Sequence, residues 1–219
     1  MQNCDITARY SPGEEIANSI THGLGTLLAC AGLVALIINA SRYGDAWHVT
    51  TSSIFGATLV FSYLVSTLYH SIPQVTAKQI LRSLDHSAIF LLIAGTYTPF
   101  MLVALRGPWG WSLFGTVWGL ALIGIVLKVT HFNRVRALSM VLYLAMGWIV
   151  IIAIKPLITV LDTSGLALLV AGGLAYTGGV AFYGWNKLPY NHAIWHLFVL
   201  AGSACHFFAI YLHVIPRPL

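Results

Sequence analysis

Seven long apolar stretches, separated by short polar breaks, follow one another along the whole chain. They cover residues 16–40, 48–71, 84–105, 109–127, 137–154, 164–184 and 190–214, to within a few positions. A helix needs about 20 consecutive apolar residues to cross the hydrocarbon core of a membrane. The breaks carry glycine, proline and charge, as in Arg106-Gly107-Pro108. The pattern predicts an all-α membrane protein, a bundle of seven transmembrane helices.

The composition agrees with a chain whose solvent is lipid. Of its 219 residues, 58% are hydrophobic and 8% charged, whereas about 25% are charged in a soluble domain. Seven helices and short loops use nearly all of the chain, so we expect a single domain over residues 1–219 with a short cytoplasmic N-terminal segment, residues 1–15. The net charge is +5, but the basic residues are scattered singly through short loops. This distribution argues against a nucleic-acid partner.

The distribution of Lys and Arg predicts the orientation, because cytoplasmic loops hold the excess of both. Seven basic residues fall on the side of the N-terminus and four on the other side. The seven are Arg9, Lys78, Arg82, Lys128, Arg134, Arg136 and Lys187, and the four are Arg42, Arg106, Lys155 and Arg217. We therefore expect a cytoplasmic N-terminus and a C-terminus outside.

Polar residues from four predicted helices converge at one membrane depth. An ionisable residue inside a span costs free energy, so we expect each one to have an interaction partner or a functional role. His70 ends the second span, Asp85 and His86 begin the third, His192 and His196 begin the last, and Glu15, Asn18 and His22 begin the first. All of these positions face the side of the N-terminus. The topology thus predicts a polar cluster at that boundary.

The spacing of the histidines favours a metal site. His192 and His196 are four residues apart, so they project from one helix face and can hold one ion. His70 is the best third ligand, because it lies at the same depth. Three histidines and a water form the open coordination of catalytic zinc, which lowers the pKa of that water to about 7. His206 lies about 15 Å from His196 along the helix, so we expect it to form an interhelical hydrogen bond instead.

Two other interpretations of the cluster remain open. The same His, Asn, Ser and Thr side chains can join helix ends by hydrogen bonds without a metal. A His and Asp relay can also move protons. A carboxylate such as Asp85 could hold or deprotonate the water or orient a ligand, and His86 could support the site or only pack between helices.

Three motifs resemble a known family. They are Glu15-x-x-Asn18-x-x-Thr21-His22, then Ser66-x-x-x-His70 followed by Leu84-Asp85, and finally His192-x-x-x-His196. Together they are similar to a bacterial hemolysin-III-type member of the progestin and adipoQ receptor superfamily, which also resembles the alkaline ceramidases. The resemblance implies a bacterial inner-membrane protein, Zn²⁺ held by His70, His192 and His196, Asp85 at the metal's water and Ser66 close by. His86, where the receptors have tyrosine, and the short N-terminal segment argue against receptor function.

The leading hypothesis is a zinc-dependent hydrolase that acts on a lipid amide or ester, with Asp85 as base and a membrane lipid as substrate or ligand. The alternative is a non-enzymatic regulator or sensor of membrane state, in which zinc only fixes the helix ends or protons move along a His and Asp relay. Pore formation has little support, because the ionisable residues gather at one end and line no continuous path.

Overall fold

The computed structural model describes residues 10–131 and 136–216, and helices account for nearly all of them. No strand occurs in these two ranges. The helices are α1 (Pro12–Tyr43), α2 (Ala46–Ser71), α3 (Val75–Pro99), α4 (Pro108–His131), α5 (Arg136–Trp148), α6 (Ile154–Val160), α7 (Thr163–Gly184) and α8 (Asn191–Ala209). Short π-helical turns extend α3 to Ala104 and α8 to Val214, and the 3-10 segment Ile149–Ala153 joins α5 to α6.

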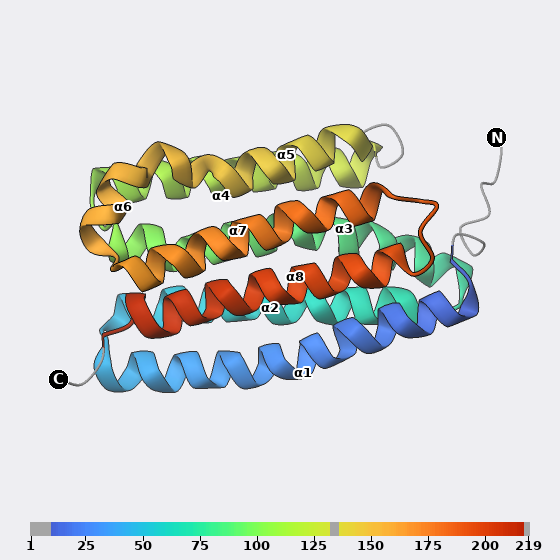
Figure 1. Cartoon of the computed structure of the whole chain (residues 1–219), viewed down its shortest axis with the longest axis horizontal. Helices are drawn as coiled ribbons and strands as arrows, with labels where there is room; N and C mark the ends of the chain where they lie inside the picture. The colour runs from blue at the N-terminus through green and yellow to red at the C-terminus, as the bar shows by residue number, and fades with distance from the viewer. Residues whose placement is uncertain (1–9, 132–135, 217–219) are drawn as a thin grey trace.

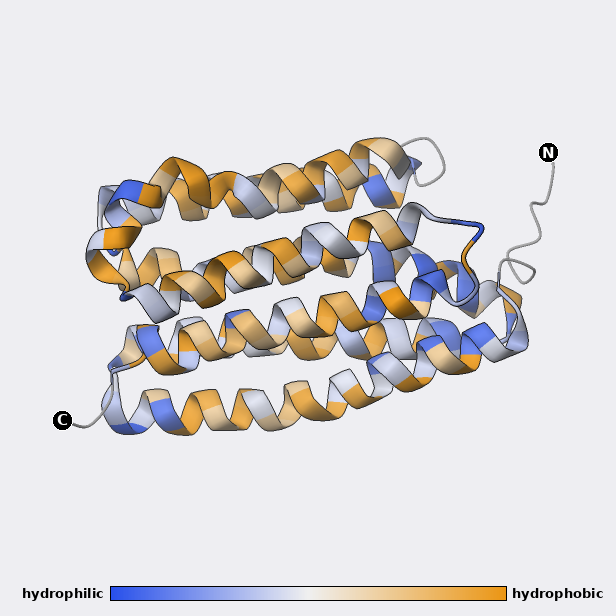
Figure 2. Ribbon diagram, viewed as in Figure 1, coloured by the Kyte–Doolittle hydropathy of each residue, from blue (hydrophilic) through white to orange (hydrophobic). Residues whose placement is uncertain are grey.

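Seven helical segments of the described chain are long and apolar enough to cross a membrane, which confirms the predicted fold class. They are Pro12–Tyr43, Ala46–Ser71, Val75–Ala104, Pro108–His131, Ala137–Val160, Thr163–Gly184 and Asn191–Val214. The helices run side by side along one axis (Figure 1), with α1, α2 and α8 on one side of the bundle and α4 and α5 on the other. Apolar residues fill the middle of the bundle, and hydrophilic residues gather where α1 and α8 begin (Figure 2).

A capping box fixes the first residue of α1. The side chain of Ser11 accepts a hydrogen bond from the backbone N–H of Glu14, and the Glu14 carboxylate accepts one from the backbone N–H of Ser11. Such a box satisfies two of the N–H groups that a helix start leaves without partners. Pro12 occupies the first turn, where a missing N–H costs nothing. This start sets the register that turns Glu15, Asn18 and His22 toward α2 and α8.

The third span begins about nine residues before its predicted start at residue 84, at Val75. Hydropathy missed this part because it is polar. It is helical nonetheless, since Lys78 Nζ bonds to the carbonyl of Tyr69 at 3.0 Å and to the Glu15 carboxylate at 2.8 Å, joining α3 to α2 and α1. Asp85 and His86 therefore lie well inside α3 and not at its first turn.

Two lysines that were counted as loop charges are buried in the bundle. Lys78 is 4% exposed and Lys128, on α4, is 1% exposed. Arg9, Arg134 and Arg217 lie outside the described residues. Without the two buried lysines, the excess of basic residues on the side of the N-terminus narrows to five against four. The basic residues therefore favour a cytoplasmic N-terminus by a smaller margin than the full count of Lys and Arg indicates.

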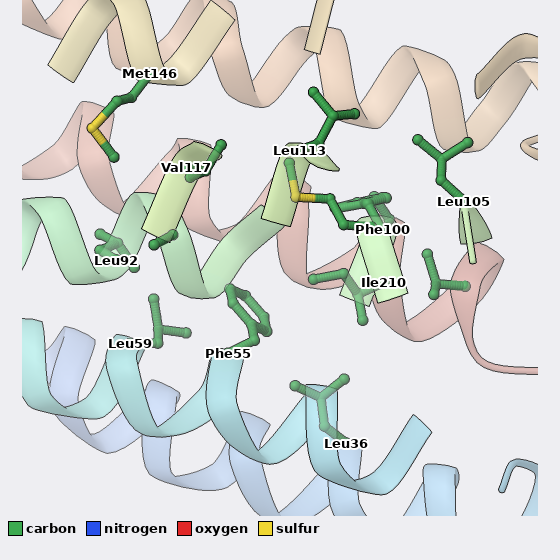
Figure 3. Packing of buried hydrophobic residues seen from close by; sticks show 14 of the residues in the cluster. Leu36, Phe55, Leu59, Leu92, Phe100, Leu105, Leu113, Val117, Met146 and Ile210 are labelled. Carbon is green, nitrogen blue, oxygen red and sulfur yellow. The ribbon is translucent and has the colours of Figure 1, made fainter. Parts of the chain in front are cut away.

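The core forms around α3, whose apolar window is more buried than that of any other span. Phe55 of α2, Phe90 of α3 and Ile210 beyond α8 are completely buried. Figure 3 shows such side chains meeting from α1, α2, α3 and the later helices. The outer faces carry large exposed aliphatic residues, such as Leu27 and Leu28 of α1 at 69% exposure each. Such exposure suits contact with lipid.

Candidate metal centre

Three buried histidines meet at the end of the bundle where α2 ends and α1 and α8 begin, which we call the histidine end. His70 comes from the last turn of α2, and His192 and His196 come from the first two turns of α8. Each of the three rings offers one nitrogen, and these three nitrogens lie within 4.8 Å of one another. The geometry could hold one metal ion, and His70, His192 and His196 are the three ligands that the sequence predicted.

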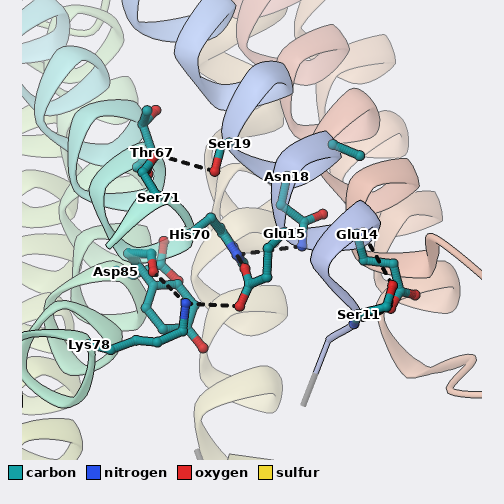
Figure 4. A network of polar contacts seen from close by, with 12 residues as sticks. Ser11, Glu14, Glu15, Asn18, Ser19, Thr67, His70, Ser71, Lys78 and Asp85 are labelled. Atoms are coloured by element: carbon teal, nitrogen blue, oxygen red, sulfur yellow. Dashed lines mark hydrogen bonds and ion pairs between the residues drawn. The ribbon is translucent and has the colours of Figure 1, made fainter. Parts of the chain in front are cut away.

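A chain of charged contacts fixes the His70 ring (Figure 4). His70 Nδ1 lies 2.6 Å from one oxygen of Glu15, and Lys78 Nζ lies 2.8 Å from the other. The amide nitrogen of Asn18 lies 3.5 Å from the same Nδ1, but the carboxylate of Glu15 is much closer and is the partner of Nδ1. Because the carboxylate accepts, Nδ1 carries the proton and the lone pair is on Nε2. That Nε2 is buried and has no hydrogen-bond partner among the described residues, as a nitrogen that binds a metal requires.

Thr21 fixes the His196 ring in the same way. Its hydroxyl donates to the carbonyls of Ala17 and Asn18, both at 2.9 Å. The hydroxyl hydrogen is thus already used, so the contact of 3.0 Å between Thr21 Oγ1 and His196 Nδ1 has the imidazole as donor. His196 Nε2 keeps its lone pair. Two of the three histidines are therefore held in the tautomer that binds a metal through Nε2.

His22 adds a fourth imidazole beside the three. Its ring stacks on His196 with the centroids 3.4 Å apart and the planes 13° from parallel. Both of its ring nitrogens are buried without a hydrogen-bond partner in the described chain. The group that could share an ion does not include it. His22 packs against the His196 ring, and the sequence could not distinguish this role from that of a further candidate ligand.

Ser66 and Asp85 both line one cavity with His192 and His196. Ser66 lies one turn before His70 and is 2% exposed, and within the described residues its hydroxyl has no hydrogen-bond partner. Asp85 reaches the cavity from α3, outside the group that could share an ion. Its carboxylate lies 3.4 Å from His86 Nδ1, but that nitrogen contacts the carbonyl of Arg82 more closely, at 2.8 Å. His86 is thus oriented mainly by its own helix.

The cavity leads from the histidines into the apolar middle of the bundle. Its volume is about 140 Å³, whereas one buried water needs roughly 10–15 Å³ on the same measure. Helices α1, α2, α3, α4, α5, α7 and α8 contribute to its wall, which contains Asp85, Lys128, Tyr143, Trp148, Trp195 and His206. Most of the wall is apolar or aromatic. The cavity has the shape and lining that an amphiphile with its polar end at the histidines requires.

Two residues of this site were missed as functional candidates. Lys78 and Lys128 were interpreted as topology signals, whereas Lys78 holds Glu15 and Lys128 lines the cavity. The signal for Lys78 was its helical spacing from Asp85, seven residues or two turns, which places both on one face of a helix that hydropathy did not extend far enough. No comparable signal marks Lys128, because a lysine in the last turn of a span ordinarily reaches the interface.

These features define an integral membrane helical bundle with a buried three-histidine group. The chain belongs to the haemolysin-III-related family, whose model matches residues 10–207. It is 50% identical over 203 residues to hemolysin-3 of Bacillus cereus, covering 93% of each chain. It is 51% identical over 205 residues to the hemolysin-3 homolog of Bacillus subtilis strain 168, covering 94% of this chain and 96% of that one.

A more distant similarity extends to mammals. The human monocyte to macrophage differentiation factor is 30% identical over 220 aligned residues, which cover 96% of this chain and 89% of the human one. The resemblance that the three motifs indicated is thereby confirmed at the level of the family. None of these relatives is named for a metal or a hydrolytic reaction.

Proposed function

We propose that His70, His192 and His196 hold a zinc ion and that the protein hydrolyses an amide or ester bond of a membrane lipid. The observation that carries the proposal is the group of ring nitrogens from His70, His192 and His196, one from each, within 4.8 Å of one another. Glu15 and Thr21 occupy Nδ1 of His70 and of His196, which leaves the Nε2 lone pairs of these two rings for a metal. A purely hydrogen-bonded cluster would pair the buried Nε2 of His70, which has no hydrogen-bond partner among the described residues, because a buried polar atom without a partner is costly.

The donor set favours zinc over other ions. Three neutral imidazoles suit Zn²⁺, whereas Mg²⁺ and Ca²⁺ prefer oxygen ligands. Sites with three protein ligands are typically catalytic, since a fourth position stays open. When bound, zinc supplies a Lewis acid and lowers the pKa of a coordinated water to about 7.

The roles of the neighbouring side chains follow from their places in the cavity wall. Asp85 acts as the base that holds and moves a proton beside the histidines. Ser66, whose hydroxyl has no hydrogen-bond partner within the described part of the chain, donates to the carbonyl oxygen of the substrate. The apolar wall beyond Trp195 takes the acyl chain and excludes bulk water from the reacting bond.

Glu15 tunes the metal affinity through His70. A carboxylate behind a ligand histidine fixes the ring and raises its basicity, and loss of such a partner typically costs 10–100-fold in metal affinity. We expect Glu15→Gln to weaken zinc binding by about that factor, measured by competition with a fluorescent chelator. Glu14→Gln is the matched control, because Glu14 bonds to Ser11 and Tyr190 at the helix start and not to a histidine. Equal affinities in the two variants would contradict this role.

Turnover tests the enzymatic part. The purified full-length chain, reconstituted in vesicles with a long-chain N-acyl amide or an acyl ester, is expected to release the free acid. A strong chelator should stop the release and added Zn²⁺ should restore it. Protein that carries one zinc ion per chain and releases acid from neither type of lipid would refute the hydrolase and leave the metal site intact.

We further propose that the histidine end faces the cytoplasm of a bacterial inner membrane. The remaining support is the excess of basic residues, five against four, on that side. A reporter enzyme that is active only in the cytoplasm, fused to the N-terminus, is expected to be active. Inactivity of that fusion, with activity of the same reporter at the C-terminus, would reverse the orientation.

A second candidate is a regulator in which zinc only clamps the bundle. The contacts at the histidine end favour this candidate, because the histidines and their partners join four helices there, α1, α2, α3 and α8. A clamp predicts that metal removal lowers the melting temperature and that Asp85→Asn changes no phenotype. Hydrolysis predicts the loss of activity in that variant.

A further inference from the structure

A second polar cluster lies deep in the same cavity, far from the histidine end. It consists of Tyr63 on α2, Tyr176 on α7, and Ser203 and His206 on α8, and we call it the tyrosine cluster. Tyr63, Tyr176 and His206 line the cavity that also reaches His192 and His196. His206 lies about 15 Å and Ser203 about 10 Å beyond His196 along α8. Polar groups at this depth require partners.

His206 has one hydrogen-bonding position left over. Its Nε2 lies 3.1 Å from the carbonyl of Leu169 on α7, which confirms the predicted interhelical bond and makes Nε2 the protonated nitrogen. Nδ1 is then an acceptor. It is buried and has no hydrogen-bond partner among the described residues. His206 is 7% exposed, so bulk solvent does not supply a partner.

The three hydroxyl groups of the cluster have one hydrogen left over. Tyr63 donates to Ser203 Oγ at 2.7 Å, and the Tyr176 hydroxyl lies 2.7 Å from the same Ser203 Oγ. The Tyr63 hydrogen also lies toward the carbonyl of Val199, with the oxygens 3.5 Å apart. The hydrogens of Ser203 and Tyr176 therefore serve the single contact between those two hydroxyls. Either hydroxyl can donate in the contact between Ser203 and Tyr176. In the arrangement in which Ser203 donates, the Tyr176 hydrogen remains, in the wall of the cavity, where a ligand can accept it. The Tyr176 and His206 rings are neighbours, with centroids 5.6 Å apart.

A surplus donor beside a surplus acceptor is matched by a group that both accepts and donates a hydrogen bond. A hydroxyl accepts one hydrogen bond and donates another, whereas an unbroken hydrocarbon chain would leave both positions without partners in a dry site. The cavity is also about ten times larger than one water needs, so a chain with a polar substituent has room there.

We propose that the tyrosine cluster is a recognition site for a hydroxyl group on the chain of the bound amphiphile, which accepts from Tyr176 and donates to His206. This inference rests on the proposed function, in which the acyl group starts at the histidines. An extended chain advances roughly 1.2 Å per bond. A separation of about 10–15 Å therefore places the hydroxyl roughly 8–12 bonds from the group at the histidines. The preferred ligand class is a long-chain lipid hydroxylated near its middle.

Binding of three fatty acids to the purified full-length protein tests the proposal. The probes are octadecanoate, 10-hydroxyoctadecanoate and 2-hydroxyoctadecanoate, each displacing a fluorescent fatty acid in detergent micelles. The 10-hydroxy acid is expected to bind roughly five- to tenfold more tightly than octadecanoate, as one or two net hydrogen bonds provide. The 2-hydroxy acid, whose hydroxyl stays near the histidines, should show no such preference.

Matched variants assign the preference to the cluster. Tyr176→Phe keeps the ring and removes only the hydroxyl, so the preference should fall at least by half, and His206→Phe should abolish it. If His206→Phe does not fold, Tyr176→Phe decides alone. Thr96→Val is the control, because Thr96 lines the same cavity but its hydroxyl already donates to the carbonyl of Leu92. That variant should keep the full preference.

The outcomes separate this inference from the proposed function. If octadecanoate binds and the 10-hydroxy acid binds no better, the hydroxyl site is wrong while the acyl cavity stands. A preference that persists in Tyr176→Phe also overturns the site. If none of the acids displaces the fluorescent probe, the acyl cavity fails and the hydroxyl site fails with it.

Discussion

Replacing His70 with alanine is expected to abolish zinc binding. His192 and His196 would remain, but two imidazoles from one helix lack the third ligand that closes the site. Purified wild-type protein should carry about one zinc ion per chain and the variant only background zinc. Because a ligand that binds only the folded state stabilises it, by about 2.7 kcal/mol at 100 times its dissociation constant, added zinc should raise the melting temperature of the wild type alone.

His206→Phe is the control for His70→Ala. It also removes a buried histidine, from the same helix as two of the ligands, but His206 bonds to Leu169 and does not belong to the group that could share an ion. It should keep its zinc. Equal zinc in wild type and His70→Ala would overturn the assignment of His70 as a ligand.

Replacing Asp85 with asparagine is expected to reduce hydrolysis by about 10²–10⁴-fold, the usual contribution of a positioned acid or base. Asparagine keeps the shape of the side chain and cannot take up the proton. Asp85 is not among the residues that could share an ion, so the zinc content should stay near one per chain. The measurement is the initial rate of acid release alongside metal analysis of the same sample.

Asp45→Asn is the matched control for Asp85→Asn. Asp45 caps α2 at the end of the bundle opposite to the histidines, and its loss should leave the hydrolytic rate unchanged. A normal hydrolytic rate in Asp85→Asn would show that Asp85 is not the base of the reaction. A rate that is lost together with the zinc would make Asp85 a structural support of the site.

The sequence predicted the seven spans well because lipid imposes a strong and simple pattern, a run of apolar residues about 20 long. It misplaced the start of α3, since Val75–Ser83 is polar and its helix is stabilised by tertiary contacts of Lys78 with Tyr69 and Glu15. Hydropathy does not detect contacts of this kind. The misplaced start of α3 made Lys78 a loop charge, and the predicted end of the fourth span at residue 127 did the same for Lys128, because α4 continues to His131.

The meeting of the three histidines could be predicted because helix direction sets depth and a separation of four residues sets the face. The tautomers could not, since they depend on which atom of Glu15 or Thr21 reaches each ring. The stacking of His22 on His196 also depends on the distance between α1 and α8. Gly25 permits this close approach, because a Cβ at that position would lie 2.8 Å from Leu200.

The tyrosine cluster could not be predicted from the sequence. Tyr63, Tyr176 and Ser203 come from three helices and carry no spacing signal in common. His206 alone attracted attention, as a histidine too far along its helix for the metal. Only the structure shows that one hydroxyl hydrogen and one imidazole nitrogen are left over beside the same cavity.

X-ray absorption at the zinc edge of the purified wild-type protein tests the metal centre most directly. The account predicts one zinc ion per chain, with three imidazole nitrogens at about 2.0–2.1 Å and one further light atom. A shell of sulfur at about 2.3 Å, from cysteines that include Cys30 and Cys205, or protein that retains no zinc after purification in its presence, would contradict it.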